Sequence, residues 1–169
     1  SILADLPDSS TNGVIIANEL LDNLAFDVAE FTTEGWAEVR VGLGDQSVTE
    51  AGTPNFVEVL APLDADRRSL IPEFAALIGD RLPMQVGIVE WIARAAECIE
   101  TGAMVIIDYA GNAEDLVRRG GWLRTYRDHT RGSKPLMHPG ESDITSDVVL
   151  EPLRDAIMAA GFRIESETT

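Results

Sequence analysis

Two short runs of apolar residues end abruptly in polar side chains. Gly13 to Ala17 leads directly into Asn18 and Glu19. Ala103 to Ile107 leads in the same way into Asp108. Continuous apolar runs of this length are typical of strands covered on both faces, as in a parallel sheet. We therefore expect two buried parallel strands whose polar ends meet at one edge of the sheet, where open α/β sheets bind ligands.

A different pattern follows the first strand. The stretches FDVAEFTT, GWAEVRVGL and NFVEVLAPL alternate apolar and polar residues with a period near two. Polar turns separate them, at Thr33 to Gly35 and at Gly42 to Asn55. This pattern predicts a three-stranded antiparallel unit. We expect it to form an antiparallel β insertion at about residues 26–63 of one domain, 1–169.

Apolar residues recur with helical spacing in three later segments. These are Asp64 to Gly79, Met84 to Gly102 with Pro83 near its first turn, and Leu150 to Ala160. Each spacing predicts an amphipathic helix. Phe162 to Glu165 is expected to start a final strand. Buried strands that alternate with helices indicate an α/β fold.

Composition and charge narrow the classes of partner. The 169 residues are enough for one domain, and 45% of them are hydrophobic. Thirteen Lys and Arg face 29 Asp and Glu, and the resulting net charge of −16 argues against nucleic acid as a partner. The acidic surface would attract a basic protein partner, although solubility alone is a simpler reason for it. The apolar runs are too short to span a membrane, and we expect a soluble protein.

Cysteine and histidine usage offers little chemistry. Cys98 is the single cysteine, so no internal disulfide forms, which fits a reducing compartment. His129 and His138 lack metal-site spacing, so we expect no zinc site.

The polar residues after the two strands are the best candidates for a site. Asn18, Glu19, Asp22 and Asp108 would be held at the productive edge of the sheet. A simpler interpretation also fits these residues: Asn18 and Asp22 could cap a short helix over Glu19 to Leu24, with Glu19 solvated in its first turn.

Three stretches resemble one known family in order along the chain. They are GVIIANELLDNLAFDVAEF, RLPMQVGIVEWIARAAECIETGAMVIIDYAG and GGWLRTYRDHTRGSKPLMHPGESDIT. They resemble the MidA-like family of S-adenosylmethionine-dependent methyltransferases, which includes the mitochondrial arginine methyltransferase that assists complex I assembly. The resemblance implies a partial class I (Rossmann-like) methyltransferase sheet with an antiparallel β extension. It also implies S-adenosylmethionine as cofactor of the full-length parent and a protein arginine as acceptor, for example on a respiratory-complex subunit. The compartment would be the bacterial cytoplasm, or the mitochondrial matrix in a eukaryote.

The resemblance also suggests roles for individual residues. Asn18, Glu19 and Asp22 would lie beside the transferred methyl group and bind the guanidinium, with Glu19 the first choice. Residues of the later motifs would line a substrate channel; they are Asp108, Tyr109, Arg124, Tyr126, His129 and Asp143. This later segment would form a lid or substrate loop. Its arginines could instead form salt bridges on an acidic protein, and His129 could make a structural hydrogen bond.

The sequence departs from the family at specific positions. Asp147 stands where the family often carries a histidine, and Ala25 replaces a proline. The Gly-rich loop that follows the first strand of such enzymes has no counterpart, because Gly42 to Gly44 and Gly120 to Gly121 lie in other contexts. We therefore expect a C-terminal portion without the N-terminal cofactor-binding strands. Such a portion would expose an apolar patch near its first strand, or cover it by forming a homo-oligomer through the sheet edge.

Two other classes of function remain open. The chain could be a non-catalytic interaction module or assembly factor, with the antiparallel unit and the basic loop within Gly111 to Gly140 as its partner surfaces. It could also be a hydrolase, which requires Glu19 and Asp108 to face each other across a pocket.

Overall fold

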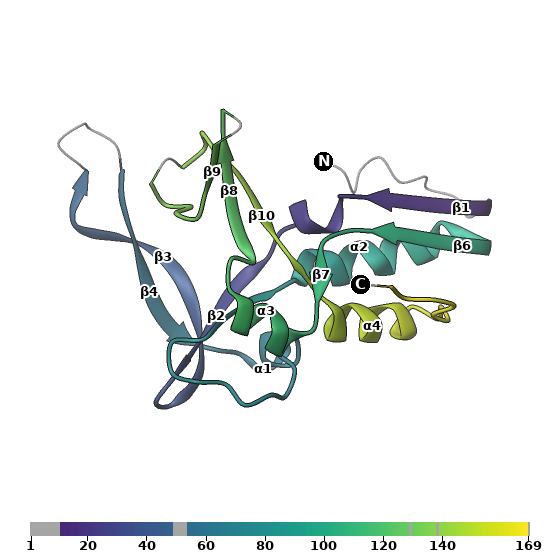
Figure 1. The fold of residues 1–169 in the computed structure, drawn as a ribbon, viewed down its shortest axis with the longest axis horizontal. Coiled ribbons are helices and arrows are strands. Elements are labelled where there is room, and N and C mark those ends of the chain that lie inside the picture. Colours follow the sequence, from purple (N-terminus) through teal and green to yellow (C-terminus); the bar gives the residue numbers. More distant parts are fainter. Residues whose placement is uncertain (1–10, 49–53, 129, 138, 169) are drawn as a thin grey trace.

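The computed structural model describes residues 11–48, 54–128, 130–137 and 139–168 (Figure 1). Strands β1 (Thr11–Asn18) and β6 (Ile99–Ile107) pair in parallel, with Val14 opposite Ala103 and Asn18 opposite Ile107. Both strands run toward the middle of the molecule and end side by side there (Figure 1). The two predicted parallel strands are therefore confirmed, and each is longer than its apolar run.

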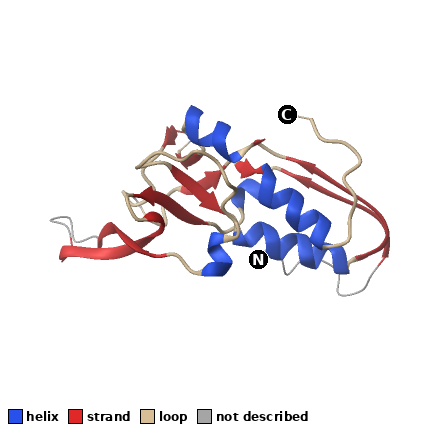
Figure 2. Ribbon diagram, turned by 90° about the horizontal axis from the view of Figure 1, so that it is seen from below, coloured by secondary structure: helices blue, strands red, loops and turns tan. Residues whose placement is uncertain are grey.

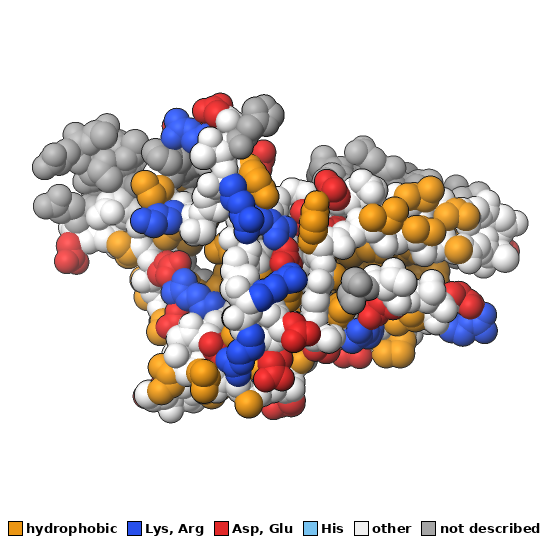
Figure 3. Space-filling view, viewed as in Figure 1, with side chains coloured by type: hydrophobic (Ala, Val, Ile, Leu, Met, Phe, Trp, Pro, Cys, Tyr) orange, Lys and Arg blue, Asp and Glu red, His pale blue; other side chains and the backbone are white. Residues whose placement is uncertain are grey.

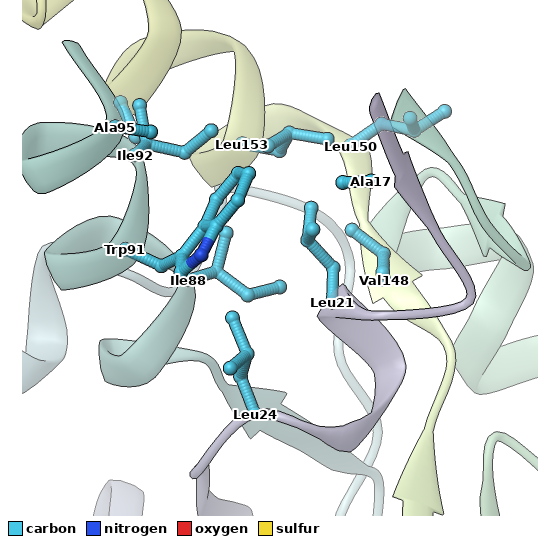
Figure 4. Close-up of a cluster of buried hydrophobic side chains, with 11 residues drawn as sticks. Ala17, Leu21, Leu24, Ile88, Trp91, Ile92, Ala95, Val148, Leu150 and Leu153 are labelled. Carbon is cyan, nitrogen blue, oxygen red and sulfur yellow. The ribbon is translucent and has the colours of Figure 1, made fainter. Parts of the chain in front are cut away.

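One face of this pair packs against helices α2 (Val86–Glu97) and α4 (Leu150–Ala159). The two helices lie side by side beneath the strands (Figure 2). Trp91 and Ile92 of α2 are buried in the core that results, together with Leu21 and Leu153 (Figure 4). Burial of large apolar side chains is the main favourable term in folding, so this cluster fixes the position of the β1 and β6 ends.

The other face of the pair is exposed. Val14, Ile16, Val105 and Ile107 are 61%, 68%, 43% and 52% exposed, and hydrophobic side chains gather over β1 and β6 in Figure 3. The prediction that these strands are covered on both faces is wrong for this structure, because the helices among its described residues pack on one side of the pair. The predicted exposed apolar patch is present on this face.

The predicted antiparallel unit is confirmed and gains a fourth strand. Its order is β4 (Pro54–Pro62), β3 (Gly35–Val48), β2 (Asp27–Thr32) and β5 (Arg81–Met84). Strand β3 continues through Gly42 to Val48, where a turn was predicted, because those residues pair with the start of β4. Pro83 lies inside β5 and not in the first turn of a helix.

A second core joins this sheet to helix α3 (Ala113–Arg119). The predicted helix over Asp64 to Gly79 is wrong, because only α1 (Ala65–Arg68) forms. Pro72 disfavours helical backbone at the residue before it. Phe74 instead packs on Trp36, with ring centroids 5.8 Å apart.

Two further predictions about element ends are wrong. Ile99 to Gly102 belong to β6 and do not extend the preceding helix. A β-carbon on Gly102 would overlap the carbonyl oxygen of Gly13, so the close approach of the two strands requires glycine there. Phe162 to Glu165 form no strand, while α4 forms close to its predicted bounds.

The remaining strands form a projection that we call the arm. It contains β8 (Leu123–Arg127) between β9 (Thr130–Gly132) and β10 (Asp143–Ser146), all antiparallel. The short parallel pair of β7 (Ala110–Gly111) and β11 (Val148–Val149) joins the arm to the core. The arm rises beside the ends of β1 and β6 (Figure 1). In the described part of the chain, no helix is both long and apolar enough to cross a membrane.

Candidate active site

The chain turns sharply where β1 ends. Glu19 adopts a left-handed backbone conformation with φ of 48°. Its backbone N–H donates to the carbonyl of Ile107 at the end of β6, over 2.8 Å. Left-handed backbone is unusual for a residue that carries a β-carbon, and such strain is often found at functional sites. The turn holds the Glu19 carboxylate at the shared end of the two strands.

Asp108 stabilises the turn that follows Glu19 through hydrogen bonds to the backbone. Its carboxylate accepts hydrogen bonds from the backbone N–H groups of Leu21 (2.8 Å), Asp22 (3.2 Å) and Tyr109 (2.9 Å). These bonds tie β6 to the 3-10 helix η2 (Leu21–Asn23), which fulfils the predicted helical turn after Glu19. Burial raises the pKa of Asp108, and the three backbone bonds oppose that effect. Asp108 therefore positions Asp22 rather than opening into solvent.

Asp22 is a buried carboxylate, 6% exposed, at the centre of this turn. Its Oδ1 accepts a hydrogen bond from the side-chain amide of Asn23 at 2.6 Å. Burial raises the pKa of Asp22, and the nearby Asp108 and Glu19 charges raise it further, while Arg124 lowers it. We call Glu19, Asp22 and Asp108 the acidic corner.

The arm supplies the opposite wall. Arg124 and Tyr126 alternate along β8 and so share one face of it. Thr145 of β10 lies opposite Arg124, and Arg131 of β9 lies opposite Tyr126. Strand β10 also lies against η2, which brings this face of the arm to the acidic corner.

Asp147 forms ion pairs with two arginines, one of which belongs to the arm. Its Oδ1 accepts a hydrogen bond from Nη1 of Arg124, and its Oδ2 accepts one from Nη2 of Arg119 at 2.5 Å. Asp147 is 4% exposed. The guanidinium carbon of Arg124 also lies 5.5 Å from the centre of the Tyr109 ring, a cation–π distance. Asp147 therefore offsets part of the positive charge of Arg124, since it also pairs with Arg119.

The acidic corner and the arm enclose a pocket of about 510 Å³. It is lined by Glu19, Asp22, Asn23, Tyr109, Arg124, Tyr126, Arg131 and Thr145. Five of the residues that the sequence nominated for the site therefore line one pocket, although they come from three separate segments. The nominated segment predicted to be a lid or substrate loop is a wall of strands.

Other nominated residues lie elsewhere. Asn18 ends β1 and Asp108 directly follows β6, but neither lines the pocket. Asp143, which pairs with Tyr126 in the arm, does not line it either. His129 lies outside the described residues. The hydrolase interpretation required Asp108 to face Glu19 across a pocket, and the backbone bonds of Asp108 do not support that arrangement.

Sequence reasoning missed the role of two amides. Asn23 lines the pocket and binds Asp22. Gln85, 4% exposed, donates from Nε2 to the Ser146 hydroxyl and to the Asp147 carbonyl, both at 3.1 Å. Its Oε1 accepts the backbone N–H of Val149 at 2.8 Å. A polar residue immediately before the apolar helix α2 was the available signal for Gln85, but its partners are more than 60 positions away.

Metal chemistry finds no support in the described part of the chain, which holds no group of three or more His, Cys, Asp or Glu side chains that could bind an ion. The pocket instead combines two carboxylates, two aromatic rings and the guanidinium groups of Arg124 and Arg131, and Arg124 is paired with Asp147. The carboxylates and the aromatic rings are groups that bind a flat or compact cation.

Two solved structures resemble this chain in fold, and both are of Burkholderia thailandensis proteins that belong to one superfamily. One is of an uncharacterized protein, with a TM-score of 0.78 and 24% identity over 93% of this chain and 41% of that chain. The other contains bound S-adenosyl-homocysteine, with a TM-score of 0.77 and 24% identity over 93% of this chain and 40% of that chain. The likeness confirms the α/β methyltransferase fold. This chain spans about two fifths of the length of either structure.

The comparison with curated proteins found no match. Comparison with family models did find one, and it extends over almost the whole chain. The model described as "Putative S-adenosyl-L-methionine-dependent methyltransferase" matches residues 3–168, and the chain therefore belongs to that family.

Proposed function

We propose that the pocket is the acceptor side of a methyltransferase site that uses S-adenosylmethionine, and that its acceptor is a protein arginine. The observation that supports this most is the presence of Glu19 and Asp22 in one pocket at the carboxyl end of β1. Ligands of open α/β sheets lie at such strand ends. Because the chain spans about two fifths of its structural neighbours, the activity is proposed for the whole protein.

Two carboxylates can bind a guanidinium through paired, charge-assisted hydrogen bonds. Glu19 is held by its turn at the open side of the pocket, and Asp22 is held deeper by Asp108 and Asn23. Together they would fix the plane of the guanidinium, and alignment of this kind contributes strongly to the rate of group transfer. Tyr109 and Tyr126 add aromatic walls on which a cation can rest.

The residues of the pocket also suit the charge of the cofactor. S-adenosylmethionine, when bound, supplies an electrophilic methyl group on a positively charged sulfur. An anionic corner stabilises positive charge close to it, so Glu19 and Asp22 are compatible with a sulfonium nearby. The raised pKa of Asp22 makes its Oδ2 a better acceptor for the proton that a guanidinium nitrogen loses.

The test compares carboxamide variants in a methyl-transfer assay of the whole protein. We expect Glu19→Gln and Asp22→Asn each to lower kcat/KM for an arginine peptide by roughly 100-fold or more, since both alignment and charge are lost. Glu90→Gln, an exposed acid on α2, is the matched control and should leave the rate unchanged. Equal rates for all three variants, or methylation of a lysine peptide in place of the arginine peptide, would refute the proposal.

A second candidate function is a non-catalytic interaction module, which the exposed apolar face of β1 and β6 favours. Calorimetric titration of this chain with S-adenosylmethionine separates the two. Binding at micromolar concentration with one-to-one stoichiometry would favour the enzyme and would refute our expectation that the cofactor-binding strands are absent. Methyl transfer by neither the chain nor the whole protein would favour the module.

A further inference from the structure

Thr145 has an unusual hydroxyl group. The residue is 7% exposed and lines the pocket. Its Oγ1 is buried and has no hydrogen-bond partner among the described residues. Buried polar side-chain atoms in proteins nearly always have a partner, so an unpaired one in a pocket points to a ligand. The hydroxyl of its neighbour Ser146, by contrast, is satisfied by Gln85.

The protein groups nearest along the strands do not satisfy this hydroxyl. Arg124 lies directly across from Thr145 in the arm, yet its Nη1 donates to Asp147. A β-branched side chain in a paired strand has little freedom to turn elsewhere. The bonds from Gln85 to Ser146 and Asp147 hold the end of β10 in place. The orientation of the Thr145 side chain is therefore set by the paired strand and not by a hydrogen-bond partner.

The rest of the pocket indicates the chemistry of the missing partner. Glu19 and Asp22 only accept hydrogen bonds when ionised, so a ligand that satisfies them must be a donor. The planar guanidinium of arginine has five N–H donors in a fixed fork, whereas an ammonium has three donors around a point. Two carboxylates account for up to four of the five guanidinium donors. A third acceptor elsewhere in the pocket lining would take a remaining one.

We propose that the Thr145 hydroxyl accepts a hydrogen bond from the guanidinium of the acceptor and thereby selects a guanidinium over an ammonium. This inference rests on the proposed function. Thr145 lies on β10, which packs against η2, so it lines the pocket next to the acidic corner. The ion pair of Arg124 with Asp147 offsets positive charge at this wall, which favours the approach of a cation.

The test measures binding of two small probes to the chain by NMR titration. The probes are N-methylguanidinium and methylammonium, and the variants are Thr145→Val and Thr145→Ser. Valine keeps the shape of threonine without its hydroxyl, and serine keeps the hydroxyl. We expect Thr145→Val to weaken N-methylguanidinium binding about tenfold, with less than a twofold change for methylammonium. Thr145→Ser should bind both probes like the wild type.

Thr125→Val is the matched control, because Thr125 of β8 is equally buried but does not line the pocket. It should bind both probes like the wild type. Thermal unfolding checks the fold: Thr145→Val should melt at the same temperature as the wild type or higher, since it removes an unsatisfied polar group.

The outcomes separate the two proposals. If wild type and Thr145→Val bind N-methylguanidinium equally, the role of Thr145 is refuted and the guanidinium pocket stands. If the wild type shows no preference for N-methylguanidinium over methylammonium, both the role of Thr145 and the arginine acceptor are refuted. If Thr145→Val unfolds at a much lower temperature than Thr145→Ser, the hydroxyl has a structural partner and the inference is also refuted.

Discussion

Asp22 and Asp147 are both buried carboxylates close to Arg124, in very different surroundings. Asp147 is 4% exposed and accepts hydrogen bonds from two arginines. Asp22 is 6% exposed, has the amide of Asn23 as its side-chain donor, and lies near two other acids. The charge of Asp147 is therefore matched within the fold, whereas that of Asp22 is maintained at a cost. Unbalanced buried charge of this kind is more typical of functional sites than of structural ones.

The largest expected effect is the loss of stability when Asp147, the carboxylate that is paired with arginines, is replaced. Asp147→Leu would leave the buried guanidinium of Arg124 without its partner, and we expect a loss of about 3–5 kcal/mol of unfolding free energy. Urea denaturation measures it. Arg119→Gln should cost much less, because the Arg119 side chain is 51% exposed. A loss for Asp147→Leu as small as that for Arg119→Gln would mean that the pair does not stabilise the arm.

Replacement of Asp22, the carboxylate without an arginine hydrogen bond among the described residues, should raise stability. Asp22→Asn removes a buried charge while keeping an oxygen for the Asn23 amide, so we expect stability at neutral pH to rise by about 1 kcal/mol. The same change should abolish binding of N-methylguanidinium. Thermal unfolding and NMR titration of one sample test both. A stability loss of similar size would show that Asp22 is structurally required.

The pH dependence of that difference provides a sharper test. The folded-state pKa of Asp22 lies above its ordinary value of 3.8, so between those two pH values the native state binds more protons than the unfolded state. Stability from this group is thus lost as pH rises through the interval. The advantage of Asp22→Asn over the wild type should be small below about pH 3.8, grow through the interval and level off above it. An advantage that does not change with pH would exclude ionisation as its cause.

The smallest effect concerns backbone strain at Glu19. Glycine accepts a φ of 48° readily, so Glu19→Gly should stabilise the chain by about 0.5 kcal/mol after the greater entropy of the unfolded glycine chain is deducted. Glu19→Ala keeps the strain and loses the carboxylate, and its stability should stay near that of the wild type. Chemical denaturation of the two variants side by side measures the difference. If alanine stabilises as much as glycine, carboxylate repulsion and not strain is the dominant cost at this position.

The sequence predicted the acidic corner because its information is local. An apolar run followed by Asn18, Glu19 and Asp22 indicates a strand end. The strand that places Arg124 beside Tyr126 was not predicted, since a lid or substrate loop was expected there. The bonds that support the site join residues far apart, such as Arg119 with Asp147 and Gln85 with Val149, and periodicity contains no signal for them. The helix predicted over Asp64 to Gly79 was wrong for the same reason, because periodicity does not show distant contacts. In the structure, Phe74 of this segment packs on the distant Trp36.

The exposed row on β1 and β6 has a consequence for the behaviour of concentrated solutions. Val14, Ile16, Val105 and Ile107 favour contact between two molecules, whereas the net charge of −16 drives molecules apart. Added salt screens the repulsion but not the apolar attraction. Near the isoelectric point, about 4.3, the repulsion disappears altogether. Colloidal stability of this chain should therefore be greatest in dilute buffer above neutral pH, and light scattering should rise with both salt and acid.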